Sequence, residues 1–161
     1  MKKNVMLVLG ILVVTIMLGL SGSILFGLFN NDQDRSIVFT NANTTKAVSE
    51  KLGSIVPSET ISETYTVKND TSITIGVNLS FVVYIGKDEG LGQYLKFKIT
   101  SGEEVLYDGY LLDATNADIT VPMIEKSKKY TVSYHLPSEV TSEQAEGKIV
   151  DVSLKFVLSN E

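Results

Sequence analysis

The stretch SITIGVNLSFVVYI, residues 72–85, decides the fold class because its apolar side chains alternate with small or polar ones. Its apolar residues occupy the odd positions Ile73, Ile75, Val77, Leu79, Phe81, Val83 and Ile85. Successive side chains of a strand point to opposite faces, whereas those of a helix repeat every 3.6 residues. The stretch therefore predicts one long strand with one buried face.

The same alternation extends outward along the chain from this stretch. It recurs in YLKFKIT at 94–100 and in KIVDVSLKFVL at 148–158, and more weakly at 63–68, 104–112, 118–124 and 128–136. Turn-forming residues separate these runs at 68–72, 86–92, 100–104 and 114–118. About eight short strands with regularly spaced turns predict an all-β domain, an antiparallel β-sandwich or jelly roll. Pro122 lies within its run and indicates an edge strand or a bulge there.

The N-terminal segment is of a different kind. Lys2 and Lys3 precede a stretch from Val5 to Phe29 that contains no charge, and the first acidic residue is Asp32. This pattern predicts a hydrophobic helix over 1–31 with its basic end in the cytoplasm, so that the rest of the chain is exported. Two interpretations stay open. The small residues at 21–23 suit a cleaved signal peptide, and the full length of more than about 20 residues suits a membrane anchor.

Residues 32–56 are expected to form a polar stalk with one short strand and a connection, ahead of a sandwich domain at 57–161. The strand is SIVFT at 36–40, and a helical turn is expected over 45–52. SIVFT is not joined to a second predicted strand by a hairpin turn, so the sequence does not show which strand it pairs with. It either closes the sandwich of its own chain or adds to the sheet edge of another chain. Ile37, Val38 and Phe39 are its candidate donor residues.

Composition excludes several classes of chemistry. The net charge is −5, and without Lys2 and Lys3 there are 12 basic against 19 acidic residues, so nucleic acid is not an expected partner. The chain has no cysteine, which excludes disulfides, thiolate metal sites and a cysteine nucleophile. Its one histidine, His135, falls on the outward-facing positions of YTVSYHL, with no catalytic motif nearby. We therefore expect no catalytic, metal or cofactor site and no enzyme activity.

Three segments resemble the TasA/camelysin family of exported Gram-positive proteins, which includes biofilm-matrix fibre subunits. They are VPSETISETYTVKNDTSITIGVNL at 56–79, LKFKITSGEEVLYDGYLLD at 95–113 and KKYTVSYHLPSEVTSEQAEGKIVDVSLKFVLSNE at 128–161. The resemblance lies in the spacing of strands, turns and the Leu-Pro pair at 136–137. It implies a jelly-roll subunit whose N-terminal strand completes the sheet of the next subunit, with 36–40 as the donor.

The expected function is accordingly that of an exported structural protein at the cell surface or outside the cell. It would associate with itself or with related matrix subunits, and the N-terminal segment would contact the membrane before cleavage or without it. The alternative is a membrane-anchored binding or adhesion module that does not polymerise and that presents the loops 86–92 and 113–118 to a ligand.

Overall fold

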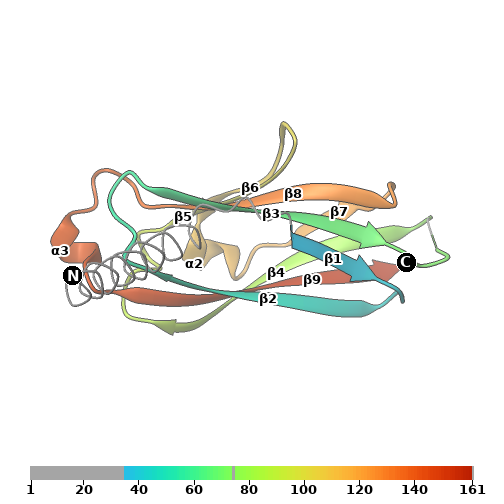
Figure 1. Ribbon diagram of the computed structural model, residues 1–161, viewed down its shortest axis with the longest axis horizontal. Coiled ribbons are helices and arrows are strands. Elements are labelled where there is room, and N and C mark those ends of the chain that lie inside the picture. The colour runs from blue at the N-terminus through green and yellow to red at the C-terminus, as the bar shows by residue number, and fades with distance from the viewer. Residues whose placement is uncertain (1–34, 74, 161) are drawn as a thin grey trace, which may run out of the picture. The chain divides into compact units, whose positions relative to one another are not determined.

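The computed structural model describes residues 35–73 and 75–160, and these form a sandwich of two β-sheets (Figure 1). The strands are β1 (Arg35–Phe39), β2 (Thr44–Gly53), β3 (Thr60–Asn69), β4 (Val77–Asp88), β5 (Lys96–Ser101), β6 (Glu104–Tyr110), β7 (Ile119–Pro122), β8 (Ser127–His135) and β9 (Ile149–Asn160). Two four-residue helices, α2 (Leu111–Ala114) and α3 (Ser142–Ala145), connect strands. The helix expected over 1–31 lies outside the described residues.

One sheet has the strand order β1-β3-β8-β5-β6 and the other has the order β2-β9-β4-β7. The prediction of an all-β sandwich is confirmed. The pairs are antiparallel with one exception, because β1 and β3 run in parallel. Between β1 and β3 the chain runs back through β2 in the opposite sheet, so β3 points in the same direction as β1. In the described parts of the chain, no helix is long and apolar enough to cross a membrane.

The long strand that the sequence predicts from residue 73 begins later, at Val77. Ile75 is 89% exposed and Ile73 is 37% exposed. The buried side chains of Asn69 and Thr71 bind this segment instead: Asn69 Nδ2 donates to the carbonyl oxygen of Ile73 at 3.0 Å, and Thr71 Oγ1 donates to the same oxygen at 3.0 Å. Side-chain bonds of this kind compete with the ladder of a sheet, so the alternation continues in the sequence where the strand does not.

The expected helical turn over 45–52 is wrong, because β2 occupies 44–53 and pairs with β9 along its whole length. Leu52 is the one buried residue of β2, so no alternation of buried apolar residues marks this segment as a strand. Its conformation comes from pairing with a segment about a hundred residues away, which a local pattern does not show. β1 and β2 thus belong to the two sheets rather than to a stalk, and the described residues form one compact unit.

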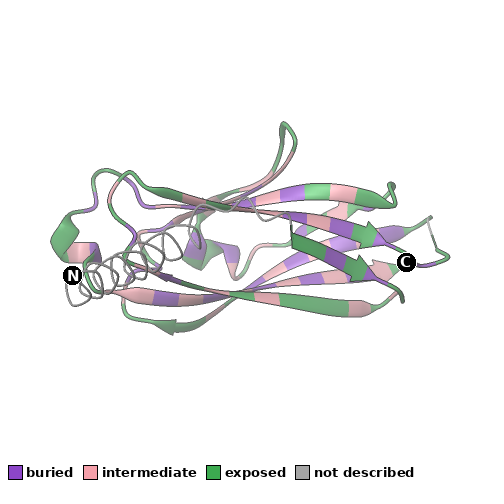
Figure 2. Cartoon of the chain, in the orientation of Figure 1, coloured by how far each residue is buried: buried purple, intermediate pink, exposed green. Residues whose placement is uncertain are grey.

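The core lies between the two sheets, and buried residues alternate with more exposed ones along most strands (Figure 2). Aromatic rings from both sheets meet at its centre: Phe81 lies 5.0 Å from Tyr130 and 5.4 Å from Phe156, and Tyr65 lies 5.2 Å from Phe156, between ring centroids. The predicted inward positions of β5, β8 and β9 are buried. The strand with Pro122, β7, is an edge strand, as predicted.

Candidate assembly strand and its docking site

The candidate site is the edge strand β1 together with the surfaces of β2 and β3 that hold it. β1 pairs with β3 of its own chain in the register Arg35↔Tyr65 to Phe39↔Asn69. Ile37 and Phe39 are buried, with exposures of 6% and 0%, whereas Val38 is 36% exposed. Two of the three predicted donor residues therefore face the core, and the third faces outward.

A loop binds the C-terminal end of β1. The backbone N–H of Asp70 donates to the carbonyl oxygen of Phe39 at 2.8 Å. The loop is itself held in place, because the N–H of Asn69 donates to the carbonyl oxygen of Lys126 at 2.8 Å and the N–H of Thr71 donates to Asn69 Oδ1 at 3.1 Å. The C-terminal end of β1 is thus bound by a loop that is itself fixed by further hydrogen bonds.

A cluster of charged side chains binds the N-terminal end of β1. Arg35 Nη1 forms an ion pair with Glu50 of β2, and Arg35 Nη2 lies 3.0 Å from Glu63 Oε1 of β3. The Tyr65 hydroxyl donates to Glu63 Oε2 at 2.6 Å. Because β2 and β3 belong to different sheets, this single arginine links both layers of the sandwich at the strand's entry point. We call Arg35, Glu50 and Glu63 the arginine clamp.

The protonation equilibria of the arginine clamp reflect its partial burial. Burial, and then the neighbouring Glu63, raise the pKa of Glu50 above its ordinary value, although Arg35 opposes the shift. Burial disfavours the cation of Arg35, but the two carboxylates favour it more strongly and the pKa of Arg35 is raised. Burial also raises the pKa values of Tyr65 and Tyr134, with further contributions from Glu63 and Glu50. The site therefore favours a cation at position 35.

Sequence reasoning missed the arginine clamp. Arg35 directly precedes the predicted strand, but the sequence predicts a helical turn at Glu50 and a weak strand without a known partner at Glu63. The available signal was a basic residue at the head of an isolated strand. Its two acidic partners could be found only once β2 and β3 were known to meet there.

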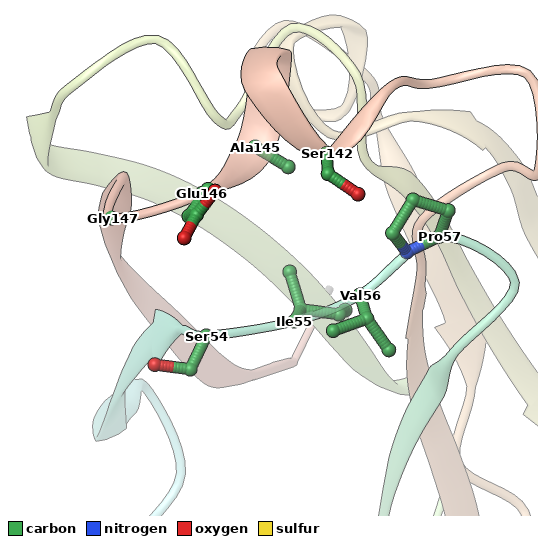
Figure 3. Close-up of a pocket in the computed structure, with 8 residues that line it drawn as sticks. All are labelled: Ser54, Ile55, Val56, Pro57, Ser142, Ala145, Glu146 and Gly147. Carbon is green, nitrogen blue, oxygen red and sulfur yellow. The ribbon is translucent and has the colours of Figure 1, made fainter.

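A pocket with a volume near 370 Å³ lies elsewhere, between the β2–β3 connection and α3 (Figure 3). Its lining residues are Ser54, Ile55, Val56, Pro57, Ser142, Ala145, Glu146 and Gly147. The lining is apolar on the side of Ile55, Val56 and Pro57, and it carries one carboxylate, Glu146. It does not include the loops 86–92 and 113–118.

The loop 86–92 carries an acidic side chain with a structural role. Asp88 Oδ1 accepts hydrogen bonds from the backbone N–H groups of Gly90, Leu91 and Gly92, at 2.9, 2.9 and 3.1 Å. These three hydrogen bonds fix the backbone conformation of the turn at 88–92.

His135 lies at the end of β8 and is partly exposed. Its Nδ1 is 2.9 Å from Thr60 Oγ1 and 3.1 Å from the carbonyl oxygen of Glu59, so the imidazole binds the neighbouring strand. The predicted outward orientation is confirmed, since Tyr134 and Leu136 on either side are buried. Across residues 35–73 and 75–160, no three His, Asp or Glu side chains cluster closely enough to hold a metal ion.

Comparison with known proteins adds little to this description. No family model matches the chain, and no curated protein matches it. Among solved structures it is similar to PliG from Aeromonas hydrophila, a periplasmic lysozyme inhibitor of g-type lysozyme. The two share 12% sequence identity over 78% of this chain and 96% of that chain, with a TM-score of 0.39. A likeness at this level carries no argument about function.

Proposed function

We propose that this chain is an exported, non-enzymatic subunit of an extracellular fibre or matrix, in which β1 of one chain pairs with β3 of the next. The observation that supports the proposal is the position of β1, an edge strand with two buried anchors and hydrogen bonding to β3. Strand addition uses these features, because main-chain bonds supply affinity and alternate side chains fill pockets. The resemblance to the TasA/camelysin family supports the same proposal.

The topology supports treating β1 as an exchangeable strand. The other eight strands form two four-stranded arrays with the orders β3-β8-β5-β6 and β2-β9-β4-β7, and we interpret this order as a jelly roll. β1 is additional to these eight strands. Its displacement breaks one strand ladder and leaves an apolar groove where Ile37 and Phe39 were buried, and the same strand from another chain would fill that groove.

Export and cleavage are linked to this assembly in our proposal. Five residues, 30–34, separate the apolar segment from β1. Fully extended, they span at most about 17 Å. An uncleaved chain would therefore hold β1 close to the membrane and could donate it only to an immediate neighbour. Cleavage before β1 frees the strand, so a growing fibre requires it.

The test is polymerisation of the exported protein, with substitutions on the two faces of β1. Phe39→Asp places a charge in the core and should abolish polymers seen by electron microscopy and sedimentation. Val38→Asp places the same charge on the outward face and is the matched control, which should still polymerise. Wild-type protein that stays monomeric in all salt and pH conditions tried would contradict the proposal.

A membrane-anchored binding module is the second candidate, and the pocket beside α3 favours it. A pocket of 370 Å³ with apolar walls and one carboxylate is of the size and kind that takes small ligands. Mass spectrometry of the native N-terminus separates the two candidates. A mature chain that begins between about Gly22 and Asn31 supports the secreted subunit, and an intact Met1 supports the anchored module.

A further inference from the structure

The two carboxylates of the arginine clamp come from opposite sheets and share one cationic side chain of β1. Glu50 and Glu63 both pair with Arg35, through different nitrogens of the guanidinium group. Each carboxylate side chain is about one-fifth exposed, at 21% and 20%. The carboxylates of Glu50 and Glu63 are thus largely shielded from solvent. They lie near each other at the edge where the sheets that contain β2 and β3 meet.

Displacement of β1 leaves this pair of like charges without its counter-ion. Burial first and Glu63 second raise the pKa of Glu50 while Arg35 opposes the shift, so loss of the cation leaves the two carboxylates to disfavour each other's ionised form. An incoming strand that restores a cation relieves the repulsion. A strand with an anion at that position would bring three negative charges together, and juxtaposed like charges suppress the wrong partners of an interface.

We infer that Glu50 and Glu63 determine the specificity of the β1 docking site and restrict it to strands with a cation at the position of Arg35. The docking site admits a strand in which a cation lies two residues before a buried apolar side chain and four residues before a buried aromatic one. In this chain these residues are Arg35, Ile37 and Phe39. A second copy of this chain satisfies that pattern. The inference rests on the proposed strand addition and names the partner that it admits.

The geometry also distinguishes arginine from lysine. The guanidinium group presents separate nitrogens to the two carboxylates, Nη1 to Glu50 and Nη2 to Glu63. A lysine ammonium is a compact charge on a flexible stem and does not reproduce this fork. We therefore expect the docking site to rank arginine first, lysine second and glutamate last at position 35.

The experiment uses the full chain, purified in the form that the cell exports, and fluorescent peptides of residues 33–41. Five peptides are compared: the natural sequence, Arg35→Lys, Arg35→Glu, Phe39→Asp, and Ser36→Glu as the matched control for Arg35→Glu. The control adds a negative charge one position away, at an exposed residue. Peptide retained in assembled protein is measured after removal of free peptide. The natural and Ser36→Glu peptides should be retained similarly, and Arg35→Glu should be reduced at least about tenfold.

Reversing the charge of the docking site should reverse the preference. The double variant E50K/E63K should retain the Arg35→Glu peptide better than the natural one. If this variant does not fold, the retention of the natural and Arg35→Glu peptides by wild-type protein tests the inference by itself. Equal retention of the natural and Arg35→Glu peptides by wild-type protein would overturn the inference alone. A Phe39→Asp peptide retained as well as the natural one, or a protein that neither assembles nor takes up peptide, would overturn the strand-addition proposal itself.

Discussion

Tyr65 and Tyr130 are buried register partners on β3 and β8 whose hydroxyl groups have different surroundings. The Tyr65 hydroxyl donates to Glu63 Oε2 at 2.6 Å. The Tyr130 hydroxyl is buried without a hydrogen-bond partner among the described residues, and burial raises the pKa of Tyr130 to about 12. A buried hydroxyl costs free energy unless it is hydrogen-bonded.

The two tyrosines therefore predict opposite effects of the same substitution. Tyr65→Phe removes a hydrogen bond to a carboxylate and should lower the free energy of unfolding by about 1.5–3 kcal/mol. Tyr130→Phe removes an unpaired polar group and should leave that free energy unchanged or raise it by about 1 kcal/mol. Denaturant unfolding of both variants checks the prediction. A larger loss of stability in Tyr130→Phe than in Tyr65→Phe would contradict the description of the core.

Glu50 predicts a pH dependence of stability. Its pKa in the folded chain is raised above the ordinary value of 4.5, mainly by burial and then by Glu63, while Arg35 lowers it. Glu63, Arg35, Tyr65 and Tyr134 are the titratable groups that influence it or are influenced by it. The folded chain then binds this proton more tightly than the unfolded chain does. The contribution of Glu50 to stability is fully present below pH 4.5 and is lost as the pH rises through the raised value.

Glu50→Gln tests this assignment because the amide keeps a carbonyl acceptor for Arg35 but does not titrate. The free energy of unfolding of the variant should fall less than that of wild type between pH 4.5 and neutrality. At neutral pH the variant should be at least as stable as wild type. If the free energies of unfolding of wild type and Glu50→Gln fall in parallel between pH 4.5 and neutrality, the assignment of this pH dependence to Glu50 is wrong. At neutral pH the charge of Glu50 is thus expected to lower the stability of the folded chain, and in our proposal its role is to select a strand that carries a cation.

At the scale of the element, β1 depends on its inward side chains. Phe39 is completely buried and Val38 is not. Phe39→Ala should lower the free energy of unfolding by about 3–5 kcal/mol, because it leaves a cavity at the edge of the core. Val38→Thr keeps the β-branched shape on the outward face and should change it by less than about 0.5 kcal/mol. Thermal or denaturant unfolding at low protein concentration compares them, and similar losses for both variants would show that β1 is not docked as described.

The strands differ in how far the sequence predicts them, and the reason is physical. β5, β8 and β9 each place one face in the core, so apolar and polar residues alternate along their sequences. β2 lies at a sheet edge with a single buried residue, and its conformation depends on β9. Ile73 and Ile75 continue the alternation of β4, but the side chains of Asn69 and Thr71 shape that segment as a loop.

At the scale of the whole molecule, the sandwich was predictable and the pairing of its first strand was not. Turn spacing and period-two alternation indicate the fold class, whereas the parallel partner of β1 follows from the path through β2. The arginine clamp follows from the same path, since Glu50 and Glu63 meet only when the edges of two sheets come together. The sequence indicates Ile37, Val38 and Phe39 alike as donor residues, because all three are apolar, and only the structure shows that Val38 faces outward.

The most direct test asks whether β1 lies against β3 of another chain in the assembled protein. The natural chain has no cysteine, so single cysteines report one contact. Val38 and Lys68 are exposed register partners on β1 and β3. Neighbouring strands lie about 4.8 Å apart, within reach of a disulfide. A chain with Val38→Cys and a chain with Lys68→Cys, assembled together and oxidised, should form a covalent heterodimer.

Val105→Cys on β6, at the opposite edge of the same sheet, is the matched control and should not cross-link to Val38→Cys. Strand addition predicts the Val38→Cys/Lys68→Cys heterodimer in polymers and little of it in monomer fractions. Polymers that yield no heterodimer, while a chain with both cysteines closes an internal disulfide, would show that β1 stays with its own chain and would contradict strand addition.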